Sequence, residues 1–182
     1  MIRILTTVLL SIVLVSCGAK LPYPTDYPLT DEIFEFRDGM MKGKVPSGWF
    51  KSADDTLAPA LSAWLLKEDL TATIVVKELM VDSMTAARIR SEGPELLAIL
   101  SAGYQGLDAE KDISNLIEYS SGGKKYCSYE TGSDNNRRRV VVFNSAGRYY
   151  ECEARILKGE WKTAEVRRLF SAQQAVLTSL IH

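Results

Sequence analysis

The sequence predicts an α+β fold in which an antiparallel sheet of five to seven strands is covered by helices. Residues 123–157 alternate apolar and polar side chains in three runs, and turn sequences separate the runs. Residues 71–79 form another alternating run that is rich in β-branched side chains. Residues 163–181 carry apolar side chains at the spacing of an amphipathic helix, which we expect to cover one face of the sheet.

The first half of the domain is expected to supply strands. Residues 31–41 fit either a short strand or a helical turn, and the pattern does not separate the two. Residues 45–50 are expected to form a turn followed by a strand with two aromatic side chains. Residues 61–66 and 71–79 follow as two strands joined by a charged turn.

Two helical segments are expected in the middle of the chain. Asp82 or Ser83 can cap the first helix, and a proline opens the second helix over residues 94–100. A Gly-Pro pair between the segments favours a break. Residues 101–115 look like a surface connection that ends near a short strand at 116–117.

The last part of the chain is the most regular. Lys124 to Glu130, Arg137 to Phe143 and Arg148 to Leu157 are predicted to form a β-meander, because each run alternates and a short polar turn joins it to the next. Thr163 is expected to cap the final helix.

The N-terminal residues have the order of a bacterial secretory signal. A positive charge at Arg3 precedes a short apolar stretch, which ends in Leu14-Val15-Ser16-Cys17. The stretch is too short for a bilayer core of ~30 Å, which needs about 20 apolar residues. Residues Leu14 to Cys17 resemble a lipobox, the sequence at which a bacterial cysteine receives a diacylglycerol and the signal peptide is cut off. The resemblance implies that residues 1–16 are a lipoprotein signal peptide and that Cys17 carries a diacylglycerol and an N-linked acyl chain.

The same resemblance implies a location. Gly18 stands where an aspartate would retain a lipoprotein at the inner membrane. A two-membrane bacterium would therefore hold the protein at its outer membrane facing the periplasm, and a one-membrane host at its cell surface. Residues 17–30 contain Pro22, Pro24 and Pro28, so we expect a semi-rigid tether there and a single globular domain over residues 31–182.

The composition excludes some classes of function. Lys and Arg total 22 against 23 Asp and Glu, so the net charge of −1 supplies no strong field for nucleic acid or for an anionic membrane. The single histidine is the last residue, His182, which nearly excludes histidine triads and the common catalytic zinc sites. Alternate carboxylates at 108–112 lack the EF-hand pattern. We therefore expect no enzyme, no metal and no cofactor.

Two cysteines remain after Cys17. Cys127 and Cys152 would often pair in an oxidising compartment. If a third strand lies between the strands that contain Cys127 and Cys152, however, the two Cα atoms are about 9.6 Å apart, beyond the usual limit of ~7 Å for a disulfide. Both outcomes stay open.

A run of three arginines is the candidate binding feature. Strand alternation places Arg137 and Arg139 on one face, where a guanidinium pair could bind a carboxylate, a phosphate or a lipid headgroup. The alternative is that the arginines pair with glutamates on neighbouring strands, namely Glu130, Glu151 and Glu153.

The turn sequence Val45-Pro46-x-Gly48-Trp49, together with the paired strands that follow it, resembles the α/β/α sandwich of PsbP-like and DcrB-type proteins. The resemblance implies a non-enzymatic accessory or envelope protein and supplies no catalytic residue. We therefore expect a lipid-anchored envelope module that binds an envelope protein. The alternative is a periplasmic carrier or sensor of a small apolar or anionic ligand.

Overall fold

The protein is described by a computed structural model, which covers residues 21–52, 60–133 and 136–182. The predicted signal peptide, residues 1–16, and Cys17 lie outside these residues. A seven-stranded antiparallel sheet forms the centre of the molecule, in the order β3-β4-β5-β9-β8-β7-β6. The predicted fold class, an α+β protein with an antiparallel sheet and helices packed on it, is confirmed.

The strand bounds follow the alternating patterns closely. The seven strands are β3 Trp49–Lys51, β4 Leu61–Lys67, β5 Ala72–Leu79, β6 Ile113–Ser121, β7 Lys124–Thr131, β8 Arg138–Ser145 and β9 Arg148–Ile156. The meander is formed by β7, β8 and β9, and β5 pairs with β9 along its whole length. Strand β8 is buried on both faces, because Val140 and Val142 face one side while Val141 and Phe143 face the other.

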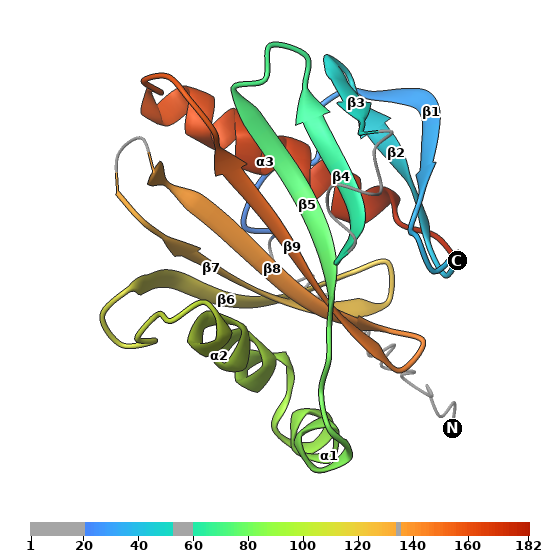
Figure 1. Cartoon of the computed structure of the whole chain (residues 1–182), viewed down its shortest axis with the longest axis vertical. Helices are drawn as coiled ribbons and strands as arrows, with labels where there is room; N and C mark the ends of the chain where they lie inside the picture. The colour runs from blue at the N-terminus through green and yellow to red at the C-terminus, as the bar shows by residue number, and fades with distance from the viewer. Residues whose placement is uncertain (1–20, 53–59, 134–135) are drawn as a thin grey trace, which may run out of the picture.

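Helices cover both faces of the sheet (Figure 1). Helices α1 Ser83–Glu92 and α2 Pro94–Tyr104 lie on one face, where α2 packs on β7 and β8. Helix α3 Thr163–Ser179 lies on the other face. The Asp82 carboxylate accepts hydrogen bonds from the backbone N–H groups of Met84 and Thr85, each at 2.9 Å, and so caps α1.

The segment 31–41, which fitted either a strand or a helical turn, is a strand as far as Glu35 and a turn after it. Strand β1 Leu29–Glu35 pairs with β2 Lys42–Pro46 as a separate two-stranded sheet beside α3. Gly43 permits this packing, because a Cβ atom there would lie 2.7 Å from Phe34 Cζ and 2.9 Å from Leu180 Cδ2. The sequence did not predict a second sheet.

The connection expected over residues 101–115 is shorter than predicted. Helix α2 continues to Tyr104, and β6 already begins at Ile113. Strand β6 is an edge strand whose side chains are mostly exposed, so its sequence lacks a clear apolar alternation. Asn115 has a φ of 52°, and the register of β6 against β7 shifts between Ser114 and Ile117. This irregularity hides the start of the strand in the sequence.

Residues 21–28 precede β1 and lie on the body of the protein. We call this segment the strap. Leu21, Tyr23 and Tyr27 pack against the core between the sheet and α3. The strap passes behind α3 in the view of Figure 1. The part of the expected tether that the structure describes is therefore attached to the domain rather than extended away from it.

Candidate functional site at the start of helix α3

The loop between β9 and α3 forms the rim of the candidate site. Thr163 was predicted to cap α3, but it is the first helical residue and Lys162 occupies the cap position. A lysine side chain cannot accept a hydrogen bond, so the cap is made in the reverse direction: the backbone N–H of Lys162 donates to Glu165 Oε2 at 2.7 Å. This bond fixes the loop residues before the helix.

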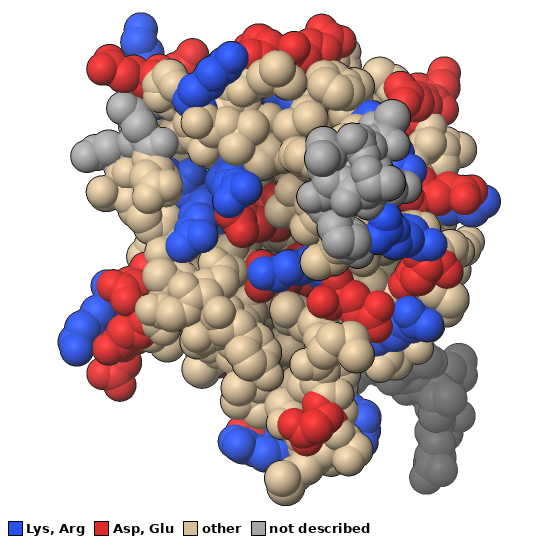
Figure 2. Space-filling view, in the orientation of Figure 1, with Lys and Arg blue, Asp and Glu red and all other residues tan. Residues whose placement is uncertain are grey.

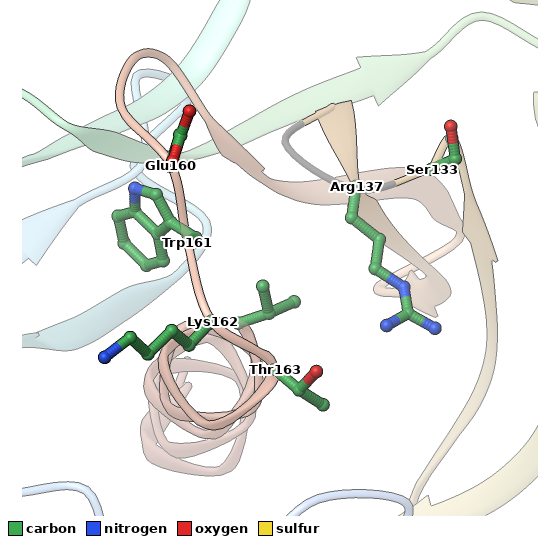
Figure 3. A pocket seen from close by; sticks show the side chains of 8 residues that line it. Ser133, Arg137, Glu160, Trp161, Lys162 and Thr163 are labelled. Atoms are coloured by element: carbon green, nitrogen blue, oxygen red, sulfur yellow. The ribbon is translucent and has the colours of Figure 1, made fainter.

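A surface pocket of about 630 Å³ opens at this end of α3 (Figure 3). It lies between the β7–β8 turn and the loop that leads into the helix. In the figure, Arg137 extends along one side of the first helical turn, and Lys162 extends away on the other. The lining residues are Gly132, Ser133, Arg137, Glu160, Trp161, Lys162, Thr163 and Val166.

A second pocket of about 550 Å³ adjoins the first and shares Glu160 and Trp161 with it. The ammonium group of Lys67 lies 5.3 Å from the centre of the Trp161 ring, within the range of a cation–π contact. The indole N–H of Trp161 donates to the backbone oxygen of Lys158 at 3.2 Å. Trp161 is therefore held in place between two concave surfaces that carry both signs of charge.

Arg139 lies beneath α3, with only 1% of its surface exposed. Its Nη1 atom donates to Gln173 Oε1 at 3.1 Å, and its Nη2 atom donates to Gln174 Oε1 at 2.8 Å and to the Tyr119 hydroxyl at 3.3 Å. The Tyr23 ring of the strap closes the site, with its centre 4.9 Å from the guanidinium carbon. The charge is thus enclosed by neutral acceptors and an aromatic face.

The strap also reaches the acidic neighbour of Arg139. Glu130 is the cross-strand partner of Arg139 and is 5% exposed. The Tyr23 hydroxyl donates to Glu130 Oε1 at 2.6 Å, and Arg137 Nε lies 3.7 Å from Glu130 Oε2. Burial raises the pKa of Tyr23 above its usual value, and the hydrogen bond to Glu130 raises it further. At neutral pH the phenol therefore keeps its proton and donates a hydrogen bond to the carboxylate.

The two arginines predicted to bind an anion both lie on the α3 side of the sheet, as alternation predicted, but they differ in burial. Arg137 precedes the first residue of β8 and lines the surface pocket. Arg139 is inside the strand and points under α3 to its own buried acceptors. The alternative fits better: Arg137 contacts Glu130, and Arg138 Nη1 lies 3.9 Å from Glu153 Oε1.

The two cysteines are free thiols. Strand β8 separates their strands, as the meander implied. Cys127 belongs to the core under α2, and Cys152 belongs to the core under α3, so their side chains leave the sheet on opposite faces. The intervening strand and the opposite directions of the side chains separate the two thiols, which opposes a disulfide between Cys127 and Cys152. Burial raises the pKa of each thiol to about 12.

The sequence did not predict a buried polar network on the face of the sheet that α2 covers. Glu151 is 1% exposed and lies 2.9 Å from Lys77 Nζ. Ser101 Oγ donates to Glu151 Oε2, and Gln105 Nε2 donates to Glu151 Oε1 at 3.0 Å. The Tyr129 hydroxyl lies 3.0 Å from Ser101 Oγ. Ser101 and Gln105 were missed because the helix was expected to end at residue 100.

Charged side chains of both signs appear on the face that Figure 2 shows. Glu153 lies between Arg138 and Arg155, whose nearest nitrogen atoms are 3.9 Å and 3.8 Å from Glu153 Oε1. Within the described ranges, no group of three or more histidine, cysteine, aspartate or glutamate side chains could hold a metal ion. No helix in that part of the chain has the length and apolar character needed to cross a bilayer.

Comparisons with known proteins establish the fold. No family model matches the sequence, and no curated protein matches it. Among solved structures, the PsbP protein of the cyanobacterium Synechocystis superposes with a TM-score of 0.51 at 13% identity, over 92% of this chain and 98% of that one. The Ran-binding protein Mog1p of Saccharomyces cerevisiae superposes with a TM-score of 0.55 at 11% identity, over 84% of this chain and 95% of that one. The chain therefore has a PsbP-like fold, as its sequence predicted.

Proposed function

We propose that the protein is a lipid-anchored envelope protein that acts as a non-catalytic binding module for another envelope protein. The lipobox-like sequence Leu14-Val15-Ser16-Cys17 is the observation that supports lipid attachment at Cys17. A diacylglycerol and an N-linked acyl chain on Cys17 make anchoring stable, because each buried methylene contributes ~0.8 kcal/mol. In a two-membrane host the anchor would lie in the outer membrane, with the domain in the periplasm.

Labelling with a fatty acid in the native host tests the anchor. We expect the wild-type protein to incorporate the label and to resist an alkaline wash of the membranes. The Cys17→Ser variant loses the label. The matched control is Cys127→Ala, because Cys127 is a buried thiol in the folded domain. If Cys17→Ser keeps both the label and the membrane association, the anchor does not exist at this residue.

The pocket at the start of α3 is the surface we assign to the partner protein. Trp161 is a large aromatic side chain held in place at the junction of two pockets, which is the kind of residue that dominates binding energy at interfaces. Arg137 and Lys162 beside it can form charge-assisted bonds with carboxylates of a partner. The surface thus combines an aromatic anchor with a polar rim.

Crosslinking in intact cells tests this assignment. A photoreactive residue at Ser133, which lines the pocket, is expected to capture one protein in constant proportion. The same residue at Ser91 on exposed α1 is the control and is expected to capture none. A Trp161→Ala variant should abolish the capture at Ser133. Equal capture from both positions would refute the assignment.

A small ligand is the second candidate, and the two adjoining pockets favour it. Their volumes of about 630 and 550 Å³ suit a small molecule, and Arg137, Lys162 and Lys67 suit an anionic one. In this function the protein is a periplasmic carrier or sensor of a small apolar or anionic ligand. Native mass spectrometry of protein purified from its own host is expected to show a retained mass that Arg137→Gln and Trp161→Ala remove. A bare protein mass in every preparation would count against the carrier.

A further inference from the structure

The strap shortens the distance between the proposed anchor and the domain. Only residues 18–20 lie between Cys17 and Leu21, and Leu21 already packs on the core. Four residue steps span at most about 14 Å. A fully extended proline-rich tether over residues 17–30 would instead reach ~40 Å. A domain held by Cys17 therefore lies directly beside the membrane surface.

The position of the strap selects the face that meets the membrane. Pro22 lines a small pocket of about 240 Å³ together with Asn115 of β6, Arg137 and Arg167, so the chain leaves the body beside the first turns of α3. The strap then runs past Arg167 and Arg168, with Pro24 and Pro28 beside these arginines. In Figure 1 the strap runs behind α3, while the Tyr23 side chain of the strap contacts Glu130 and Arg139 of the sheet.

Exposed arginines flank the strap. Arg167 and Arg168 lie on the outer side of α3, and Arg137 keeps 40% of its side chain exposed. The guanidinium carbon of Arg168 lies 5.6 Å from the Tyr27 ring, which holds the side chain against the strap. The carboxylates nearby are Asp26, which is exposed on the strap, Glu165, which accepts the hydrogen bond of the helix cap, and Glu130, which contacts Arg137. Arg167 and Arg168 are therefore exposed cations that the strap face offers to an anionic group.

We infer that this strap face, made by residues 21–28 with Arg167 and Arg168, rests on anionic phospholipid headgroups of the leaflet that holds the acyl chains. The inference depends on the proposed lipid anchor at Cys17. Guanidinium groups bind phosphates through paired N–H groups, and a negatively charged leaflet attracts basic side chains within a Debye length of its surface. The connection from Leu21 to Cys17 spans at most about 14 Å, so it lets the arginines approach the surface to within that range.

Hydrogen exchange of the acylated full-length protein in vesicles tests the inference. One set of vesicles contains about 30% phosphatidylglycerol in phosphatidylcholine, and the other contains phosphatidylcholine alone. We expect slower exchange of the strap and the first turns of α3 in the anionic vesicles only, and no change in α1. The Arg167→Gln/Arg168→Gln variant should lose this protection. The control Arg88→Gln/Arg90→Gln removes the same charge from exposed α1 and should keep it. Arg137 stays unchanged because it contacts the buried Glu130.

The outcomes separate this inference from the proposed anchor. A protein that carries the fatty-acid label but shows no protection of the strap face, or equal protection in both vesicles, overturns the inference and leaves the anchor intact. Protection that needs an added envelope protein also overturns it, in favour of a protein partner. If the label is absent, sedimentation of the mature Cys17→Ser chain with vesicles at low salt tests whether the strap face binds anionic phospholipids. Binding to anionic vesicles that falls up to about 25-fold in Arg167→Gln/Arg168→Gln supports the surface, since each arginine contributes about fivefold. Absence of such binding refutes it.

Discussion

Replacement of Tyr23 tests whether the strap is part of the folded domain. The Tyr23→Phe substitution removes only the hydroxyl that donates to Glu130 at 2.6 Å. A hydrogen bond to a charged group contributes about 1.5–3 kcal/mol. Tyr23 is half-buried and Arg137 remains 3.7 Å from the same carboxylate, so we expect the lower part of this range. The free energy of unfolding should fall by about 1.5–2 kcal/mol.

The Tyr23→Ala substitution also removes the ring. The ring makes an edge contact with Phe170, with centres 5.3 Å apart, and covers the guanidinium of Arg139. These two contacts add about 0.5–1.5 and 0.5–1 kcal/mol. The total loss for Tyr23→Ala should therefore reach about 3 kcal/mol. Urea denaturation of the mature Cys17→Ser chain, followed by circular dichroism, measures both variants.

Tyr104 supplies the matched control, because it is 65% exposed at the end of α2. Tyr104→Phe and Tyr104→Ala should each change the free energy of unfolding by less than about 0.5 kcal/mol. A double-mutant cycle between Tyr23→Phe and Glu130→Gln isolates the hydrogen bond and should give a coupling of at least about 1 kcal/mol. If the Tyr23 variants are no less stable than the Tyr104 variants, the strap does not dock and the short distance to the membrane no longer follows.

Three further predictions concern the core. Gly43→Ala should destabilise the fold by about 1–3 kcal/mol in urea denaturation, because the new Cβ would lie 2.7 Å from Phe34 Cζ. Glu151→Ala should cost about 3 kcal/mol, since it leaves the Lys77 ammonium and the Ser101 hydroxyl without their acceptor; an unchanged midpoint would show that the network contributes nothing. Stability should fall between about pH 9 and pH 12, because both buried thiols ionise near pH 12 when folded and near pH 8.5 when unfolded. A flat stability profile over this range would contradict their burial.

The sequence predicted the sheet well where strands are buried on one or both faces. The alternation in β7, β8 and β9 is regular because the two cores demand apolar side chains at fixed positions. Strand β6 lies at the edge with few buried positions, so its pattern was weak. The β1–β2 sheet escaped prediction because its pairing depends on a close approach to Gly43, which no periodicity reveals.

The candidate site was harder to predict. Alternation correctly placed Arg137 and Arg139 on one face, but it did not predict that Arg137 precedes β8 and is partly exposed while Arg139 is in the core. The acceptors of Arg139 are glutamines 173 and 174, which lie far along the chain on α3. The strap has the composition of a tether, and only its contacts with Glu130, Phe170 and Arg139 show that it docks. Tertiary contacts of this kind leave no local signal in a sequence.

The strap makes the stability of the fold and the distance to the membrane depend on each other. To reach the full extension of ~40 Å, residues 21–28 would have to leave the body and give up the contacts of Tyr23. At a cost of about 3 kcal/mol, roughly one molecule in a hundred or fewer would be extended at any time. Detachment would also expose Glu130 and the guanidinium of Arg139 to water, which offsets part of the lost hydrogen bonding but restores none of the aromatic contacts. A domain anchored through Cys17, as we propose, is therefore held beside its leaflet by the packing of Leu21, Tyr23 and Tyr27, and substitutions that weaken that packing should both destabilise the fold and lengthen its reach.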